Sequence, residues 1–125
     1  MELRVSTRLV EPDITVVELS GRIKMGAEGR GVETLVKDLL TKNQKKIVFD
    51  LAGVEYIDSS GMGTIAQCVS SAIQADGGLR IAAATGKVLR LFQMTRMDTF
   101  LDCFLTVEDA CRNFPTRQPG DKKRW

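Results

Sequence analysis

The chain has 125 residues, of which 43% are hydrophobic and 27% are charged, and its formal net charge at pH 7 is +2. These values are typical of a single soluble globular domain and give no general attraction for nucleic acid. Histidine is absent, which excludes His-assisted serine or cysteine nucleophiles, histidine phosphorelay and most zinc chemistry.

Two further features of the composition bear on location and redox chemistry. No segment approaches about 18 consecutive apolar residues, and the N-terminus has charged residues where a signal peptide would be apolar, so we expect a cytoplasmic protein without membrane insertion. The three cysteines lie far apart and form no Cys-x-x-Cys pair. Cys68, Cys103 and Cys111 are therefore interpreted as small hydrophobic residues rather than a disulfide framework or a metal site.

The first half of the chain alternates strands and a helix. Residues 3–5 and 14–19 have strand character, separated by a turn at residues 11–13. A glycine-rich stretch at 26–31 precedes an amphipathic helix whose apolar residues recur at helical spacing, namely Val32, Leu35, Val36 and Leu39. Residues 47–51 form an apolar strand that we expect at the centre of a sheet.

The second half repeats the alternation. A helix is predicted over about 60–75, ended by two glycines, and its buried stripe consists of Met62, Ile65, Ala66, Val69 and Ile73. A short strand at 79–84 precedes a third helix around Val88, and residues 99–105 are predicted as an edge strand. Thr106 is predicted to cap a last helix. This alternation indicates an α/β domain over 1–114, and the basic segment 115–125 is predicted to be a disordered tail.

The most informative motif lies at residues 54–63, with the sequence VEYIDSSGMG, between the central strand and the second helix. Asp and Ser are preferred N-cap residues, so Asp58, Ser59 or Ser60 is expected to cap that helix. A helix N-terminus can also bind an anion or present a serine to a kinase. From the residues alone, capping is the first interpretation, although one cap requires only one of these three polar side chains.

Enzymatic motifs are not complete anywhere in the sequence. Ser59 lacks the Gly-x-Ser-x-Gly context of a nucleophile elbow, and the segment 84–88 has neither the glycine spacing nor the Ser or Thr of a phosphate loop. Asp50 and Asp58 are too far apart along the chain to predict a shared ion. We expect a protein that is not an enzyme and that needs no cofactor.

Around the motif at residues 54–63 the chain resembles the STAS family, which comprises bacterial anti-sigma factor antagonists and the cytoplasmic domain of sulfate transporters. The matching pieces are the strand at 47–51, the segment 56–63, the glycine pair before the strand at 79–84, the helix at 88–95 and residues 19–23. The resemblance covers about residues 3–114. It implies a mixed sheet of four to five strands, with about four helices packed mainly on one face.

The resemblance also implies a function. In the family, the unphosphorylated domain binds an anti-sigma factor that is also a serine kinase, and so releases a sigma factor. The kinase then phosphorylates the first serine of the Asp-Ser-Ser-Gly element, which corresponds to Ser59, with Ser60 as the competing acceptor. Partner contacts are expected from the same segment and from one residue after the second strand: Asp58, Ser59, Ser60, Gly61, Met62, Gly63 and Lys24.

The expected partners are an anti-sigma factor serine kinase and a phosphatase, with no nucleic acid, and the protein itself is expected to be a monomer or a weak dimer. Lys24 departs from the acidic residue that many family members carry there, which leaves the identity of the kinase open. Two alternatives implied by other STAS proteins also stay open. They are a scaffold of a stress-signalling assembly and a soluble partner of a lipid or anion transporter.

Overall fold

The computed structural model describes residues 3–24, 26–112 and 114. The predicted tail at 115–125 lies outside the described residues. In chain order the elements are β1 (Arg4–Val10), β2 (Ile14–Ile23), α1 (Ala27–Thr41), β3 (Lys46–Ile57), α2 (Ser59–Gln74), β4 (Gly78–Ala82), α3 (Gly86–Met94), a 3-10 turn (Met97–Thr99), β5 (Cys103–Phe104) and α4 (Val107–Cys111).

The strands form one five-stranded sheet in the order β1-β2-β3-β4-β5. The β1–β2 pair is antiparallel, whereas the β2–β3, β3–β4 and β4–β5 pairs are parallel. The predicted mixed α/β sheet is therefore confirmed, and the apolar strand around Ile47 is central, as expected. Parallel strands need crossover connections, and here α1, α2 and α3 supply them.

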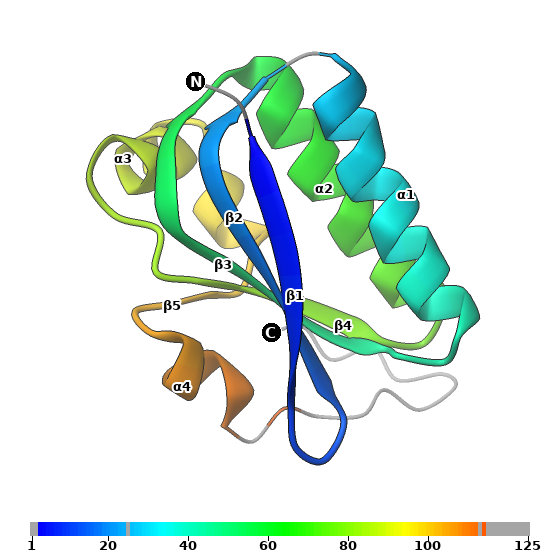
Figure 1. Ribbon diagram of the computed structural model, residues 1–125. Helices are drawn as coiled ribbons and strands as arrows, with labels where there is room; N and C mark the ends of the chain where they lie inside the picture. Colours follow the sequence, from blue (N-terminus) through cyan, green and yellow to red (C-terminus); the bar gives the residue numbers. More distant parts are fainter. Residues whose placement is uncertain (1–2, 25, 113, 115–125) are drawn as a thin grey trace.

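Both faces of the sheet are covered, but unequally. Figure 1 shows α1 and α2 side by side along one face and the short α4 on the other. The larger core lies beneath α1, α2 and α3, and its most buried members include Val36, Phe49, Ile65, Val69 and Phe92. Most members of the two predicted stripes are buried in this core, namely Val32, Val36, Leu39, Met62, Ile65 and Val69. Leu35 and Ile73 are only partly buried against it, and Ala66 is half-buried. The prediction that helices pack mainly on one face is confirmed.

Three strands differ from their predicted bounds, two because pairing lengthens them and one because the chain coils before it. β1 and the second half of β3 extend well beyond 3–5 and 47–51, although many of their residues are exposed. Backbone pairing with β2 keeps both strands extended, up to the pair Ile23 and Ile57. The predicted edge strand at 99–105 is instead a 3-10 turn followed by the two-residue β5, because residues 97–99 coil before the chain reaches β4.

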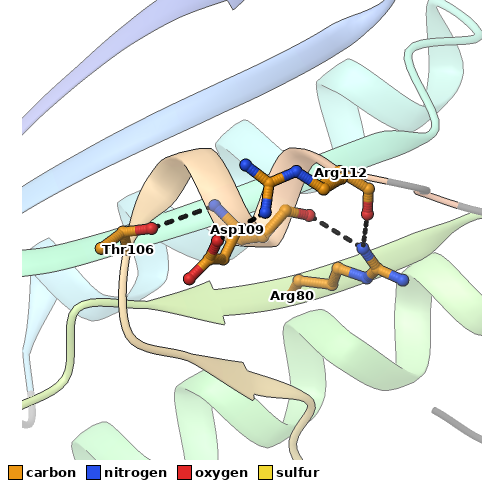
Figure 2. A network of polar contacts seen from close by, with 5 residues as sticks. Arg80, Thr106, Asp109 and Arg112 are labelled. Carbon is orange, nitrogen blue, oxygen red and sulfur yellow. Dashed lines mark hydrogen bonds and ion pairs between the residues drawn. The ribbon is translucent and has the colours of Figure 1, made fainter.

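A buried arginine holds α4 against the second face. The Arg80 guanidinium, in the middle of β4, donates from Nη1 to the carbonyl oxygens of Ala110 and Arg112 at 2.9 and 3.1 Å (Figure 2). The Arg80 Nε also forms an ion pair with the Asp102 carboxylate at 3.4 Å. The central carbon of the Arg80 guanidinium, Cζ, lies 4.8 Å from the ring centroid of Phe104 and 4.5 Å from that of Phe114.

Thr106 caps α4, as predicted, because its hydroxyl accepts from the backbone N–H of Asp109 at 3.0 Å (Figure 2). The last helix has only five residues, which is too short to be stable by itself in water. Its position therefore depends on the cap, on burial of Ala110 and on the hydrogen bonds from Arg80.

Candidate functional site

The candidate site lies where two parallel strands end side by side. The register of β2 and β3 pairs Arg22 with Tyr56 and Ile23 with Ile57. The backbone N–H of Asp58 then donates to the carbonyl oxygen of Ile23 at 3.2 Å. Because the carboxyl ends of parallel strands meet at one edge of a sheet, this contact brings the segment after β3 next to the segment after β2, where Lys24 lies.

Asp58 is the N-cap of α2. Its backbone is extended, and its Oδ1 accepts from the backbone N–H of Gly61 at 2.7 Å. The capping interpretation of the motif is therefore confirmed, and among the three candidates it falls on Asp58. Because Asp58 is the N-cap, Ser59 and Ser60 are the first two residues of the helix. Both of their side chains are exposed.

The remaining motif residues divide between core and surface. Ile57, Gly61 and Met62 are buried, whereas Gly63 is exposed. Met62 belongs to the larger core. Burial gives Gly61 and Met62 a positioning role in the structure, so the exposed surface available to a partner at this point comes from Ser59, Ser60, Gly63 and Lys24, with Asp58 half-buried among them.

Gly61 fixes the start of α2 against β2. A Cβ atom at this position would overlap the carbonyl oxygen of Ile23 and would come within 2.9 Å of Ile23 Cγ2. The helix can approach the strand end this closely only because the residue has no side chain. The requirement for glycine is therefore steric, and it holds Ser59 in a defined position relative to β2.

Gly61→Ala is expected to lower the free energy of unfolding by about 1–3 kcal/mol, because the methyl group forces helix and strand apart. Gly63→Ala is the matched control, since no atom lies within 4 Å of a Cβ placed there. Alanine is the better helix former, so this control should raise the stability by about 0.5–1 kcal/mol. Urea denaturation of both variants measures the difference, and equal effects of the two substitutions would contradict this packing.

A shallow groove of about 430 Å³ opens beside the motif, between the end of β3 and the start of α3. Ser59 and Asp58 line one side of it, and Lys87, Val88 and Leu91 line the other. The sequence motif did not identify the residues of α3, because they are far from Ser59 along the chain. The one hint in the sequence was Lys87, which follows Thr85-Gly86 at the start of a predicted helix. Because this segment does not complete a phosphate-loop motif, it did not indicate a site.

The charges around Ser59 are mixed. The guanidinium of Arg22 lies over the Tyr56 ring, 5.3 Å from its centroid, and both side chains are exposed. Lys87 is exposed beside the groove, and Glu55 and Asp58 line the same groove. A partner that docks here therefore meets basic groups, acidic groups and an aromatic ring within one surface. Such a mixture favours specific recognition over general electrostatic attraction.

The cysteines have environments that suit packing and not nucleophilic chemistry. Burial raises the pKa of the Cys68 thiol to about 12 and that of Cys103 to about 11. Both thiols are therefore protonated at neutral pH, and a protonated thiol is a poor nucleophile. Within residues 3–24, 26–112 and 114, no three His, Cys, Asp or Glu residues come together in a way that could hold a metal ion.

Among the helices that the structure describes, none is both long and apolar enough to cross a membrane.

Most of the described domain matches a known protein family. The family model for the STAS domain matches residues 7–110. A protein of Thermotoga maritima, described as a candidate anti-sigma factor antagonist, is 22% identical and superimposes with a TM-score of 0.80, covering 88% of this chain and 93% of its own. An anti-sigma factor antagonist of Mycobacterium paratuberculosis is 19% identical, with a TM-score of 0.75 over 90% of this chain and 94% of its own.

A third similar structure is the Bacillus cell fate determinant SpoIIAA in its phosphorylated form. It is 16% identical, with a TM-score of 0.66 over 86% of this chain and 96% of its own. At these identities the three similarities establish the fold.

Proposed function

The chain belongs to the STAS domain family, and on that premise we propose that it is an anti-sigma factor antagonist controlled by phosphorylation of Ser59. In this proposal the unphosphorylated domain sequesters an anti-sigma factor that is also a serine kinase, and so releases a sigma factor in the cytoplasm. The kinase ends the interaction by phosphorylating Ser59, and a phosphatase restores it. The domain itself acts by binding its partner and catalyses no reaction.

The observation that carries the proposal is the position of Ser59. Its side chain is exposed in the first turn of α2. Asp58 before it caps the helix, and Gly61, two residues after it, packs on Ile23. A kinase can thus reach the hydroxyl, and a partner surface can cover it. The similar anti-sigma factor antagonists and the phosphorylated state of SpoIIAA support the same reading.

Charge explains how the modification would act. A phosphoserine carries roughly −1.5 to −2 charges at neutral pH, and a partner that covers it must remove its hydration. Asp58 adds repulsion next to it, whereas the N-terminus of α2 and nearby Lys87 reduce the cost within the free domain. Phosphorylation should therefore penalise the complex more than the free domain. A loss of only about 1.4 kcal/mol weakens binding tenfold.

The test uses the cognate serine kinase as both enzyme and ligand. Ser59→Asp is expected to weaken binding of the kinase at least about tenfold, since it places a charge on the proposed contact surface. Ser59→Ala should keep the affinity and the stability, because Asp58 supplies the cap, and should abolish phosphorylation. Isothermal titration calorimetry gives the affinities, and phosphopeptide mapping after incubation with ATP locates the phosphate.

Ser60→Ala is the matched control, since Ser60 is also exposed in the first turn of α2. This variant should still be phosphorylated. Phosphate found only on Ser60, or an affinity for the kinase that Ser59→Asp leaves unchanged, would contradict the assignment.

A further inference from the structure

The outer edge of the sheet is formed by β1, whose residues 4–9 are all exposed. Within residues 3–24, 26–112 and 114, β1 pairs only with β2. Its apolar side chains Val5 and Leu9 are 41% and 58% exposed. A seven-residue edge strand with exposed apolar side chains is a template for pairing with another strand.

The two faces of β1 differ in chemistry. Val5 pairs with Leu19 and Thr7 pairs with Val17 across the β1–β2 ladder. Leu19 and Val17 belong to the core beneath α1 and α2. Because side chains alternate along a strand, Val5, Thr7 and Leu9 all lie on the α1–α2 face of the sheet.

The opposite face of β1 carries Arg4, Ser6 and Arg8 together with Val10, and two of its polar side chains are already bonded to β2. The Ser6 hydroxyl donates to Glu18 Oε1 at 3.1 Å, and the Arg8 Nε pairs with Glu18 Oε2 at 3.0 Å. Arg4 lies on this same face, opposite Ser20. The carboxylate of Glu18 thus partly neutralises this face of the strand.

We propose that two copies of the chain associate through β1, antiparallel about a two-fold axis at Thr7. Such an interface is isologous, so each contact occurs twice. In this register Val5 of one copy faces Leu9 of the other, and the two Thr7 side chains face each other. Apolar and Thr–Thr cross-strand pairs of this kind each contribute favourably.

Charge selects this register over its neighbours. With the axis at Thr7, Arg8 faces Ser6 of the other copy and Arg4 faces Val10. Moving the axis to Ser6 would place Arg4 opposite Arg8, and moving it to Arg8 would place the two Arg8 side chains opposite each other. Like charges directly opposite are destabilising. Sliding one strand past the other by a single residue would instead bring opposite faces of the two strands together. The Thr7 register avoids both.

The pairing would join two five-stranded sheets into one continuous sheet, with α1 and α2 of both copies on the same face. The two copies of the site at the carboxyl ends of β2 and β3 would then lie at opposite ends of the joined sheet. Both copies of Ser59 would stay accessible, so the association is compatible with the proposed function and does not depend on it.

Sedimentation equilibrium of the full chain, from low micromolar to millimolar concentration, tests the association. The parent should show a concentration-dependent dimer, and Leu9→Lys and Val5→Lys should each raise its dissociation constant at least about tenfold. Leu105→Lys is the matched control, since Leu105 is 78% exposed and lies outside β1. Circular dichroism checks that all variants fold. A parent that is monomeric at every concentration, or an equal effect of Leu105→Lys, would overturn the proposal.

Disulfide trapping tests the register. Directly opposed residues have Cβ atoms about 4.5–5.5 Å apart, close to the spacing of a disulfide. Under mild oxidation Thr7→Cys should therefore give a covalent dimer well above the level of the parent, whose three native cysteines set the background. Ser6→Cys should not, because the proposed register places it opposite Arg8. Equal trapping of the two variants would exclude the Thr7 axis.

Discussion

Val69→Asp is expected to leave the domain unfolded or aggregated at 25 °C. Val69 is 1% exposed and lies on the face of α2 that packs against the sheet. The substitution removes the apolar burial of the valine and introduces a carboxyl group with no partner there. Together these changes cost at least about 4 kcal/mol, which is a large share of the 5–15 kcal/mol that is typical of a domain.

Circular dichroism and size-exclusion chromatography measure this outcome. Gln67→Asp is the matched control, because Gln67 lies on the same helix and is exposed. It should unfold cooperatively at nearly the temperature of the parent. A variant Val69→Asp that melts like the parent would show that the face of α2 assigned to the core is wrong.

Arg80→Ala is expected to lower the free energy of unfolding by about 3–5 kcal/mol, the usual cost of removing one partner of a buried ion pair. The side chains of Arg80 and Asp102 are 9% and 17% exposed. Burial raises the pKa of Asp102, although the charge of Arg80 acts in the opposite direction. Removing the guanidinium would therefore leave a poorly hydrated carboxyl group, and it would leave the carbonyl oxygens of Ala110 and Arg112, at the end of α4, without this donor.

Arg112→Ala provides the comparison within the same cluster. Arg112 forms an ion pair with Asp109 at 2.9 Å, but its side chain is 62% exposed. Exposed pairs of this kind contribute between about 0 and 1 kcal/mol. Urea denaturation of both variants should therefore give a much larger loss for Arg80→Ala. Equal losses would mean that Arg80 contributes no more than a surface arginine.

The helices could be predicted because each depends on a pattern that is local in sequence. The spacing of Val32, Val36 and Leu39 defines one buried face, and Thr106 supplies a cap three residues before the N–H that it satisfies. The extension of β3 beyond Leu51 could not be predicted in the same way. Its second half has few buried residues, and pairing with β2 keeps it extended.

The residues of the candidate site differ in the same way, because some are adjacent in sequence and others are brought together only by packing. Asp58 and Ser59 were identified because they are adjacent in sequence and stand between a strand and a helix. Lys87 and Leu91 were missed because only the packing of α3 beside the end of β3 brings them to the groove. Arg80 was missed for a related reason. A charged residue inside a short strand suggests exposure, and its partners Asp102 and Phe104 are supplied by a distant segment.

The anchoring of Ser59 bears on how an enzyme could select it. To draw Ser59 into an extended conformation would break the 2.7 Å hydrogen bond from Gly61 to Asp58 and lift Gly61 away from Ile23. If Ser59 is phosphorylated as proposed, we therefore expect the kinase to accept the serine on an intact helical turn. Its choice of substrate would be made on the shape of the folded domain, and the short peptide around the serine would carry little of the information. Two domains with the same Asp-Ser-Ser-Gly segment but different residues at the positions of Lys24 and Lys87 would then be different substrates.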